Sequence, residues 1–214
     1  MQMRMYSVVL LASVIGAASP AAAQEVALKG GVAWSNFDAD GPTPFDQRLV
    51  ATSLGGHMRF RFGPVWLQPE LHVVTRGAEI ADSLQTQLRV EYLEVPLLLT
   101  VPFRFGAYEV YAFGGPMVAL ETRCRSITEA NDLKTNVACD PPRPPLFERR
   151  ALDYGLAAGG GASRELGSGR LLIEARRTWG MNNIYEGGGA TELRNQTLVL
   201  LIGYVIAWDA EEGT

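Results

Sequence analysis

The chain has 214 residues, with 19 basic and 23 acidic side chains, a formal net charge of −4 at pH 7 and two cysteines. This mildly acidic balance argues against a nucleic-acid-binding protein, which would carry a basic patch. The length fits a single domain with ample apolar surface.

The first 23 residues predict a secretory signal peptide. Arg4 precedes an apolar stretch that ends near Ala18, and small residues precede a cleavage point after Ala23. This order is typical of an export signal, and the apolar stretch is too short for a membrane-spanning helix. We therefore expect residues 1–23 to be removed after export to the periplasm.

Beyond this leader, apolar and polar side chains alternate in several segments, which predicts β-strands with one apolar and one charged face. In one such segment, Met58, Phe60 and Phe62 alternate with Arg59 and Arg61. No later apolar run is long enough for a membrane-spanning helix. We predict eight strands, near residues 25–36, 50–62, 65–76, 87–101, 107–121, 150–163, 170–179 and 195–208.

The connections between these strands alternate between long and short. A tight turn at Gly63 and Pro64 follows a long polar loop, and the longest loop, at 122–149, is followed by a short turn near residue 167. This alternation is typical of outer-membrane barrels, which have long loops outside the cell and short periplasmic turns. The sequence therefore predicts an all-β, eight-stranded antiparallel up-and-down transmembrane β-barrel at 24–208, followed by a short polar tail at 209–214.

A barrel of this size has an interior filled by side chains, so its charged faces should meet inside. We predict an interior charge network of Arg59, Arg61, Glu70, Arg76, Arg89, Glu91, Glu94, Glu174 and Arg176.

The segment VEYLEVPLLLTV, residues 90–101, does not fit this network by simple alternation, which would place Glu91 and Glu94 on opposite faces. We therefore predict a β-bulge near Tyr92 and Leu93 that turns both carboxylates inward, and Pro96 is tolerated beside it.

Aromatic side chains are expected at the two membrane interfaces. The predicted interface residues are Trp34, Tyr92, Trp179, Tyr204 and Trp208.

Cys124 and Cys139 both lie in the longest predicted loop. In an exported protein, such a pair predicts a disulfide, which would close a loop of about 15 residues and contribute about 3 kcal/mol. We expect it to fix the shape of this loop.

His57 and His72 are the two histidines of the chain, and with Glu70 they resemble a metal or acid–base cluster. Their position on inward faces of a narrow barrel favours packing and hydrogen bonding instead. We predict no catalytic residue, no metal site and no cofactor.

Six segments, in chain order, resemble the PorT-like porin-family proteins with an outer-membrane β-barrel domain: LKGGVAWSNF, LQPELHVVTRGAE, YLEVPLLL, VYAFGGPMVAL, LDYGLAAGGGA and LIEARRTWGMNNI. The resemblance covers about 26–208 and implies an eight-stranded barrel in a Gram-negative outer membrane. It implies little chemistry, because most members carry no assigned activity. The chain departs from the family where DAEEGT follows Trp208 and in the loop that contains the cysteines.

The predicted function is a structural or surface-interaction role through extracellular loops, without catalysis. The expected partners are outer-membrane lipid and lipopolysaccharide, the barrel-assembly machinery during biogenesis, and an unidentified surface partner, but no nucleic acid. Two alternatives remain open: a narrow channel for small solutes, and a soluble periplasmic barrel whose apolar stripes point inward to bind an apolar ligand.

Overall fold

The computed structural model describes residues 25–39, 45–80, 85–130, 133–139, 152–182 and 193–207. The predicted leader, Trp208 and the predicted tail at 209–214 lie outside these ranges. Within the described part of the chain, no helix is long and apolar enough to cross a membrane. The described strands are β1 (Glu25–Ala39), β2 (Phe45–Phe62), β3 (Val65–Ile80), β4 (Gln85–Phe105), β5 (Tyr108–Ala130), β6 (Leu133–Ala138), β7 (Leu152–Leu166), β8 (Gly169–Gly180) and β9 (Leu193–Ala207).

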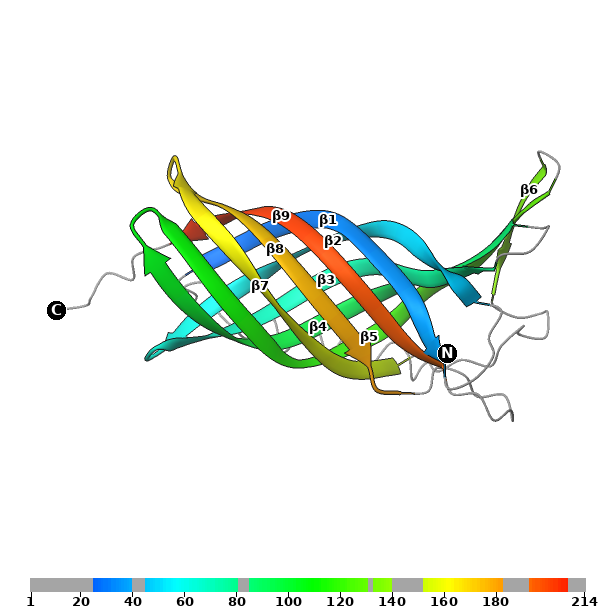
Figure 1. The fold of residues 1–214 in the computed structure, drawn as a ribbon, viewed down its shortest axis with the longest axis horizontal. Helices are drawn as coiled ribbons and strands as arrows, with labels where there is room; N and C mark the ends of the chain where they lie inside the picture. Colours follow the sequence, from blue (N-terminus) through cyan, green and yellow to red (C-terminus); the bar gives the residue numbers. More distant parts are fainter. Residues whose placement is uncertain are drawn as a thin grey trace.

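The strands form a closed antiparallel barrel. Each of β1, β2, β3, β4 and β5 pairs with the next in the chain, β5 pairs with β7, and β7, β8 and β9 follow in turn. β1 pairs with β9 along its whole length, from Glu25 opposite Ala207 to Ala39 opposite Leu193, and this pairing closes a ring of eight strands. β6 pairs with the end of β5 and extends it as a hairpin beyond the ring (Figure 1). The predicted eight-stranded up-and-down barrel is confirmed.

Three tight turns lie together at one end of the barrel, on the left in Figure 1. Gly63, Gly106 and Gly167 occupy them with φ of 61°, 60° and 62°, a backbone conformation that favours glycine. β6 lies at the opposite end. We call these the turn end and the loop end.

The orientation of side chains is the reverse of that in a water-soluble protein. Leu28 and Ile202 are 68% and 59% exposed, whereas Lys29, Arg59 and Glu70 are at most 3% exposed. Such an extensive apolar outer surface is typical of a membrane barrel, whose outer face contacts the hydrocarbon of the bilayer. The alternative of a soluble barrel with inward apolar stripes is therefore wrong, because the apolar stripes face outward.

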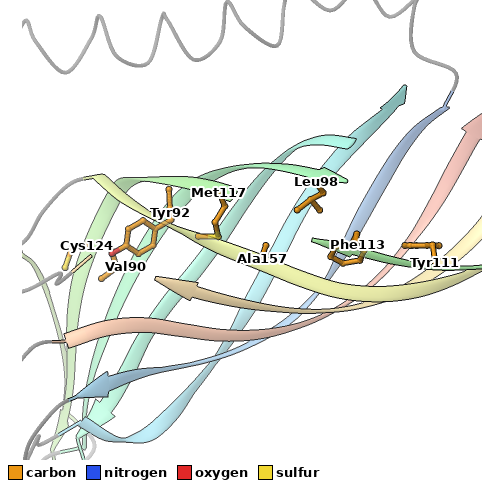
Figure 2. Close-up of a cluster of buried hydrophobic side chains, with 9 residues drawn as sticks. Val90, Tyr92, Leu98, Tyr111, Phe113, Met117, Cys124 and Ala157 are labelled. Carbon is orange, nitrogen blue, oxygen red and sulfur yellow. The ribbon is translucent and has the colours of Figure 1, made fainter. Parts of the chain in front are cut away.

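One side of the interior is apolar. Figure 2 shows this column of side chains from β4, β5 and β7, which comprises Val90, Tyr92, Leu98, Tyr111, Phe113, Met117, Ala119, Cys124 and Ala157. Glycines on β7 make room for its rings: a Cβ on Gly161 would lie 2.5 Å from the Tyr111 hydroxyl oxygen. Bulky and minimal side chains thus fit together inside the barrel.

The segment 90–101 keeps strict alternation, so the predicted bulge in β4 is wrong. Glu91 pairs with Arg123 and Tyr92 with Glu121, which leaves Thr122 of β5 as the extra residue. The irregularity therefore lies in β5, and β4 points Tyr92 inward and Glu91 outward.

Pro96 lies at a gap in the pairing of β3 with β4. The pairs on either side of the gap are Pro69 with Leu97 and His72 with Glu94. A proline is tolerated here because it has no backbone N–H to donate.

Candidate functional site

The buried charges form three clusters along the barrel axis. The turn-end cluster contains Glu25, Arg59, Glu109 and Arg170; the central cluster contains Lys29, Glu70, Glu174 and Arg176; and the loop-end cluster contains Arg76, Glu94 and Asp153. These residues are the candidates for any chemical function inside the barrel.

The central cluster joins opposite walls of the barrel. Lys29 Nζ lies 2.8 Å from Glu70 Oε1 and 2.9 Å from Glu174 Oε2. Arg176 contacts both carboxylates, with its Nη2 2.6 Å from Glu174 Oε1. Because Glu70 is on β3 and Arg176 on β8, which are diametrically opposite in the ring of eight strands, their contact crosses the barrel centre. Two cations and two carboxylates balance in charge, as buried ions require.

The two histidines belong to this central region. His72 Nε2 lies 2.9 Å from Glu70 Oε2, and His57 Nδ1 lies 3.9 Å from Glu70 Oε1. Two cations and a glutamine amide also donate to Glu70. The carboxylate is thus fully engaged, which leaves it no role as a general base. Among the residues that the structure describes, no group of His, Cys, Asp and Glu is arranged to hold a metal ion.

The turn-end cluster fills the interior at the turn end of the barrel. Arg59 Nη1 lies 3.3 Å from Glu25 Oε2 and 3.0 Å from Glu109 Oε1. Arg170 Nη2 lies 2.6 Å from Glu25 Oε2. Arg104, 59% exposed at the rim, adds an ion pair of 3.0 Å to Glu109.

The loop-end cluster has one cation for two carboxylates. Arg76 pairs with Glu94, and its Nη1 lies 3.7 Å from Asp153 Oδ2. Arg76 also donates to the Thr178 hydroxyl at 3.3 Å, and Asn195 donates to Asp153 at 3.0 Å. Since Thr178 is on β8, this arginine of β3 also reaches across the barrel.

Six of the nine predicted network residues are buried in the interior: Arg59, Glu70, Arg76, Glu94, Glu174 and Arg176. The prediction is wrong for the other three. Arg61 lies exposed at the turn end, where its Nε donates to the Gly63 carbonyl at 3.4 Å. Arg89 and Glu91 lie on the outer face, because β4 has no bulge to turn them inward.

The predicted network omitted five members of these clusters: Glu25, Lys29, Glu109, Asp153 and Arg170. The signal for Lys29 was present, since Val26, Leu28 and Val32 alternate with it. Glu109 was harder to assign, because its inward neighbours Tyr111 and Phe113 are as apolar as the outward ones.

The disulfide joins the loop-end hairpin to the barrel. Cys124 and Cys139 are bonded across a sequence separation of 15 residues. Cys124 is buried at the loop end of the apolar column, next to Val90 (Figure 2). The Cys139 amide donates to the Cys124 carbonyl at 3.2 Å, directly before the pairing of Arg125 with Ala138 begins. The base of the hairpin is therefore fixed to the wall.

The predicted interface aromatics lie in different places. Trp34, Trp179 and Tyr204 are on outward-facing positions, and the Tyr204 hydroxyl donates to the Leu166 carbonyl at 2.9 Å. The prediction is wrong for Tyr92, which is 2% exposed inside the barrel. Arg76 lies 5.5 Å from the centre of its ring. Trp208 lies outside the described residues.

A family model for the outer membrane protein beta-barrel domain matches residues 22–186. The chain belongs to this family. No curated protein matches the chain.

Solved structures similar to this member of the outer membrane protein beta-barrel domain family cover most of its length. Ail, the attachment invasion locus protein of Yersinia pestis, in complex with the heparin analogue sucrose octasulfate, is 13% identical over 85% of this chain and 98% of its own, with a TM-score of 0.46. Neisserial surface protein A is 9% identical over 86% and 97%, with a TM-score of 0.48. The N-terminal β-barrel domain of Pseudomonas aeruginosa OprF is 10% identical over 86% and 98%, with a TM-score of 0.34.

Proposed function

We propose that this outer-membrane β-barrel has a structural or surface-interaction role, without catalysis, and that the hairpin of β5 and β6 makes the contact with a surface partner. The finer PorT-like assignment rests on the six segments that resemble that family. Export by residues 1–23, insertion by the barrel-assembly machinery and a surrounding layer of lipid and lipopolysaccharide complete this proposal.

The observation that carries it is the hairpin at the loop end. A tilted transmembrane strand needs about 9–11 residues, whereas β5 has 23, from Tyr108 to Ala130. Its continuous run of outward apolar side chains ends at Leu120, and the next outward positions are Thr122, Arg123 and Arg125, so the last ten residues of the strand extend past the apolar belt. With the disulfide at its base, the hairpin is preorganised, which lowers the conformational entropy lost on binding.

A narrow channel is not favoured by the interior. Two contacts cross the centre of the barrel: Arg176 of β8 pairs with Glu70 of β3, and Arg76 of β3 donates to Thr178 of β8. Conduction would require these buried ion pairs to separate, which is strongly unfavourable in a low-dielectric interior.

Surface display tests the orientation. An epitope inserted between residues 130 and 133 should bind antibody on intact cells, and the same epitope at Ala107, in a turn at the opposite end, should bind only after the outer membrane is permeabilised. Antibody binding to both epitopes, or to neither, on intact cells would contradict the proposed topology.

The interaction role is tested by photo-crosslinking on intact cells. A photoreactive residue at the exposed Asn136 should give an adduct of discrete mass, which is lost in the C124S/C139S variant. A photoreactive residue at Ala107 serves as the control. If Asn136 gives no adduct beyond that of the control, the hairpin is not an interaction surface and the structural role alone stands.

A further inference from the structure

Three arginines come together on the outer face of β4 and β5, just beyond the apolar belt. Arg89 of β4 is directly opposite Arg125 of β5, and the next outward pair is Glu91 with Arg123. The Arg123 side chain is 56% exposed, Arg125 is exposed and Arg89 is half-buried. The three arginines thus occupy neighbouring positions on the outer face of the sheet.

This arrangement is unfavourable in isolation. Side chains directly opposite on antiparallel strands have Cβ atoms about 5 Å apart, and like charges there destabilise the sheet. Among the described side chains, no carboxylate is paired with Arg89 or Arg125. Arg123 has Glu91 at 3.8 Å. Among the side chains that the structure describes here, three cations and one carboxylate leave a local excess of two positive charges, which an anion would neutralise.

The surrounding positions leave the arginines open to a ligand. On the outer face, Arg89 is flanked by Gly77 of β3, and Arg125 by Ala138 of β6. Gln87 Oε1 accepts from Arg89 Nε at 3.1 Å and from Nη2 at 2.9 Å, which holds this guanidinium in place, and no described residue is bonded to Nη1. The neighbours therefore position the group without covering it.

The disulfide also positions the site. Cys124 lies between Arg123 and Arg125 in sequence, with its side chain on the opposite face of the strand. Because it is bonded to Cys139 at the start of the hairpin, the local strand geometry that sets the spacing of the two arginines is fixed.

The height of the site matches the headgroup layer. On β4 the outward apolar positions end, toward the loop end, at Leu93, and Arg89 lies four residues further toward the loop end. Four residues span about 13 Å along a strand, or about 9 Å along the membrane normal at a tilt of 45°. The headgroup region begins at the edge of the hydrocarbon, and a flexible arginine side chain can lower its guanidinium toward it.

The distribution of outward-facing arginines is asymmetric. In the part of the chain that the structure describes, the turn end has one outward-facing arginine, Arg164, whereas the loop end has Arg48, Arg89, Arg123, Arg125, Arg177 and Arg194. The sequence has 17 arginines and two lysines. Guanidinium, unlike ammonium, forms paired hydrogen bonds with phosphate oxygens, so this composition suits phosphate recognition.

We propose that Arg89, Arg123 and Arg125 bind a phosphate group of a phosphorylated glycolipid headgroup in the outer leaflet. A phosphate monoester carries a charge of about −1.5 to −2, which neutralises the local excess of two. This inference rests on the proposed orientation, in which the loop end faces the outer leaflet. Arg89 lies on the barrel wall and Arg125 at the base of the hairpin, whereas the photo-crosslinking position Asn136 lies on β6.

Binding is measured on the refolded full chain in a zwitterionic detergent, with bisphosphorylated lipid A and dephosphorylated lipid A as probes. The R89Q/R125Q variant should bind bisphosphorylated lipid A at least about tenfold more weakly than the wild type. The matched control R61Q/R164Q removes two exposed arginines from the turn end and should bind within about twofold of the wild type. The R89K/R125K variant, which keeps the charge but loses paired hydrogen bonding, should be intermediate.

Equal weakening by R89Q/R125Q and R61Q/R164Q would overturn the proposal in favour of general charge attraction. Equal affinity for dephosphorylated lipid A would show that acyl chains alone are bound. Competition by inorganic phosphate at the same concentration as lipid A would show an adventitious ion only. Heat-dependent gel migration of each variant confirms that the barrel is folded.

Discussion

Removal of one carboxylate from the central cluster should destabilise the barrel more than almost any other single change. The Glu70 side chain is fully buried and pairs with both Lys29 and Arg176. In E70M the two cations share Glu174, and one buried positive charge is left without a partner. Breaking a buried pair in this way costs about 3–5 kcal/mol. We expect a loss of this size in the free energy of unfolding, measured by urea titration in lipid vesicles with tryptophan fluorescence.

A double-mutant cycle separates lost charge balance from lost packing. In K29M/E70M one cation and one carboxylate are removed together, and the pair of Arg176 with Glu174 remains balanced. The double variant should therefore lose at least about 2 kcal/mol less than the sum of the two single variants. E91Q, on the outer face where the side chain is 37% exposed, is the control and should change stability by less than about 1 kcal/mol. An E70M variant as stable as E91Q, or strictly additive single variants, would refute the reasoning.

Three further predictions concern the hairpin, the glycines and conduction. Removal of the disulfide in C124A/C139A should leave heat-dependent gel migration intact but make the hairpin susceptible to trypsin, because the constraint across 15 residues is lost; unchanged protection would contradict a role in fixing the hairpin. G161V should cost about 1–3 kcal/mol in urea unfolding, since a Cβ there would lie 2.5 Å from the Tyr111 hydroxyl oxygen, whereas the outward-facing A162V should be neutral; equal effects would refute this packing. The purified barrel should show no sustained conductance in a planar bilayer, and discrete steps at moderate voltage would show that the central ion pairs do not close the lumen.

The barrel itself could be predicted from the sequence because its signals are local and repeated. Alternation of apolar and charged residues, as between Met58 and Phe62, indicates several of the strands, and the lengths of the connections indicate which strands are neighbours. Where a strand alternates strictly with charges on one side, as at Glu174 and Arg176, the inward residues were predicted as well.

The errors arose where position along the strand, and not the face alone, decides the environment. Arg61 follows the inward pattern but lies at the turn end of β2, one residue before the strand ends, where it is exposed. Glu91 was turned inward by an assumed bulge in β4, whereas Thr122 of β5 is the extra residue. A bulge belongs to a pair of strands, so one strand's sequence does not show which partner contains it.

Residues that meet across the barrel could not be paired from the sequence. The contact between Glu70 and Arg176 depends on the registers of several successive strand pairs, and a shift of one residue in any of them would reverse a face. The inward face is also not uniformly charged, because Tyr92 and Phe113 point inward, so polarity alone does not show which residues face the interior.

We conclude that the chain spans a membrane with its apolar faces outward, and a nitroxide scan along β9 would test this placement. Both native cysteines are bonded to each other, so single cysteines can be labelled under non-reducing conditions. In outer-membrane vesicles, labels at Leu198, Leu200 and Ile202 should show high accessibility to lipid-dissolved oxygen, and labels at Val199 and Leu201 should show low accessibility. The opposite alternation, or uniform accessibility to a water-soluble relaxation agent, would contradict the barrel's placement in the membrane.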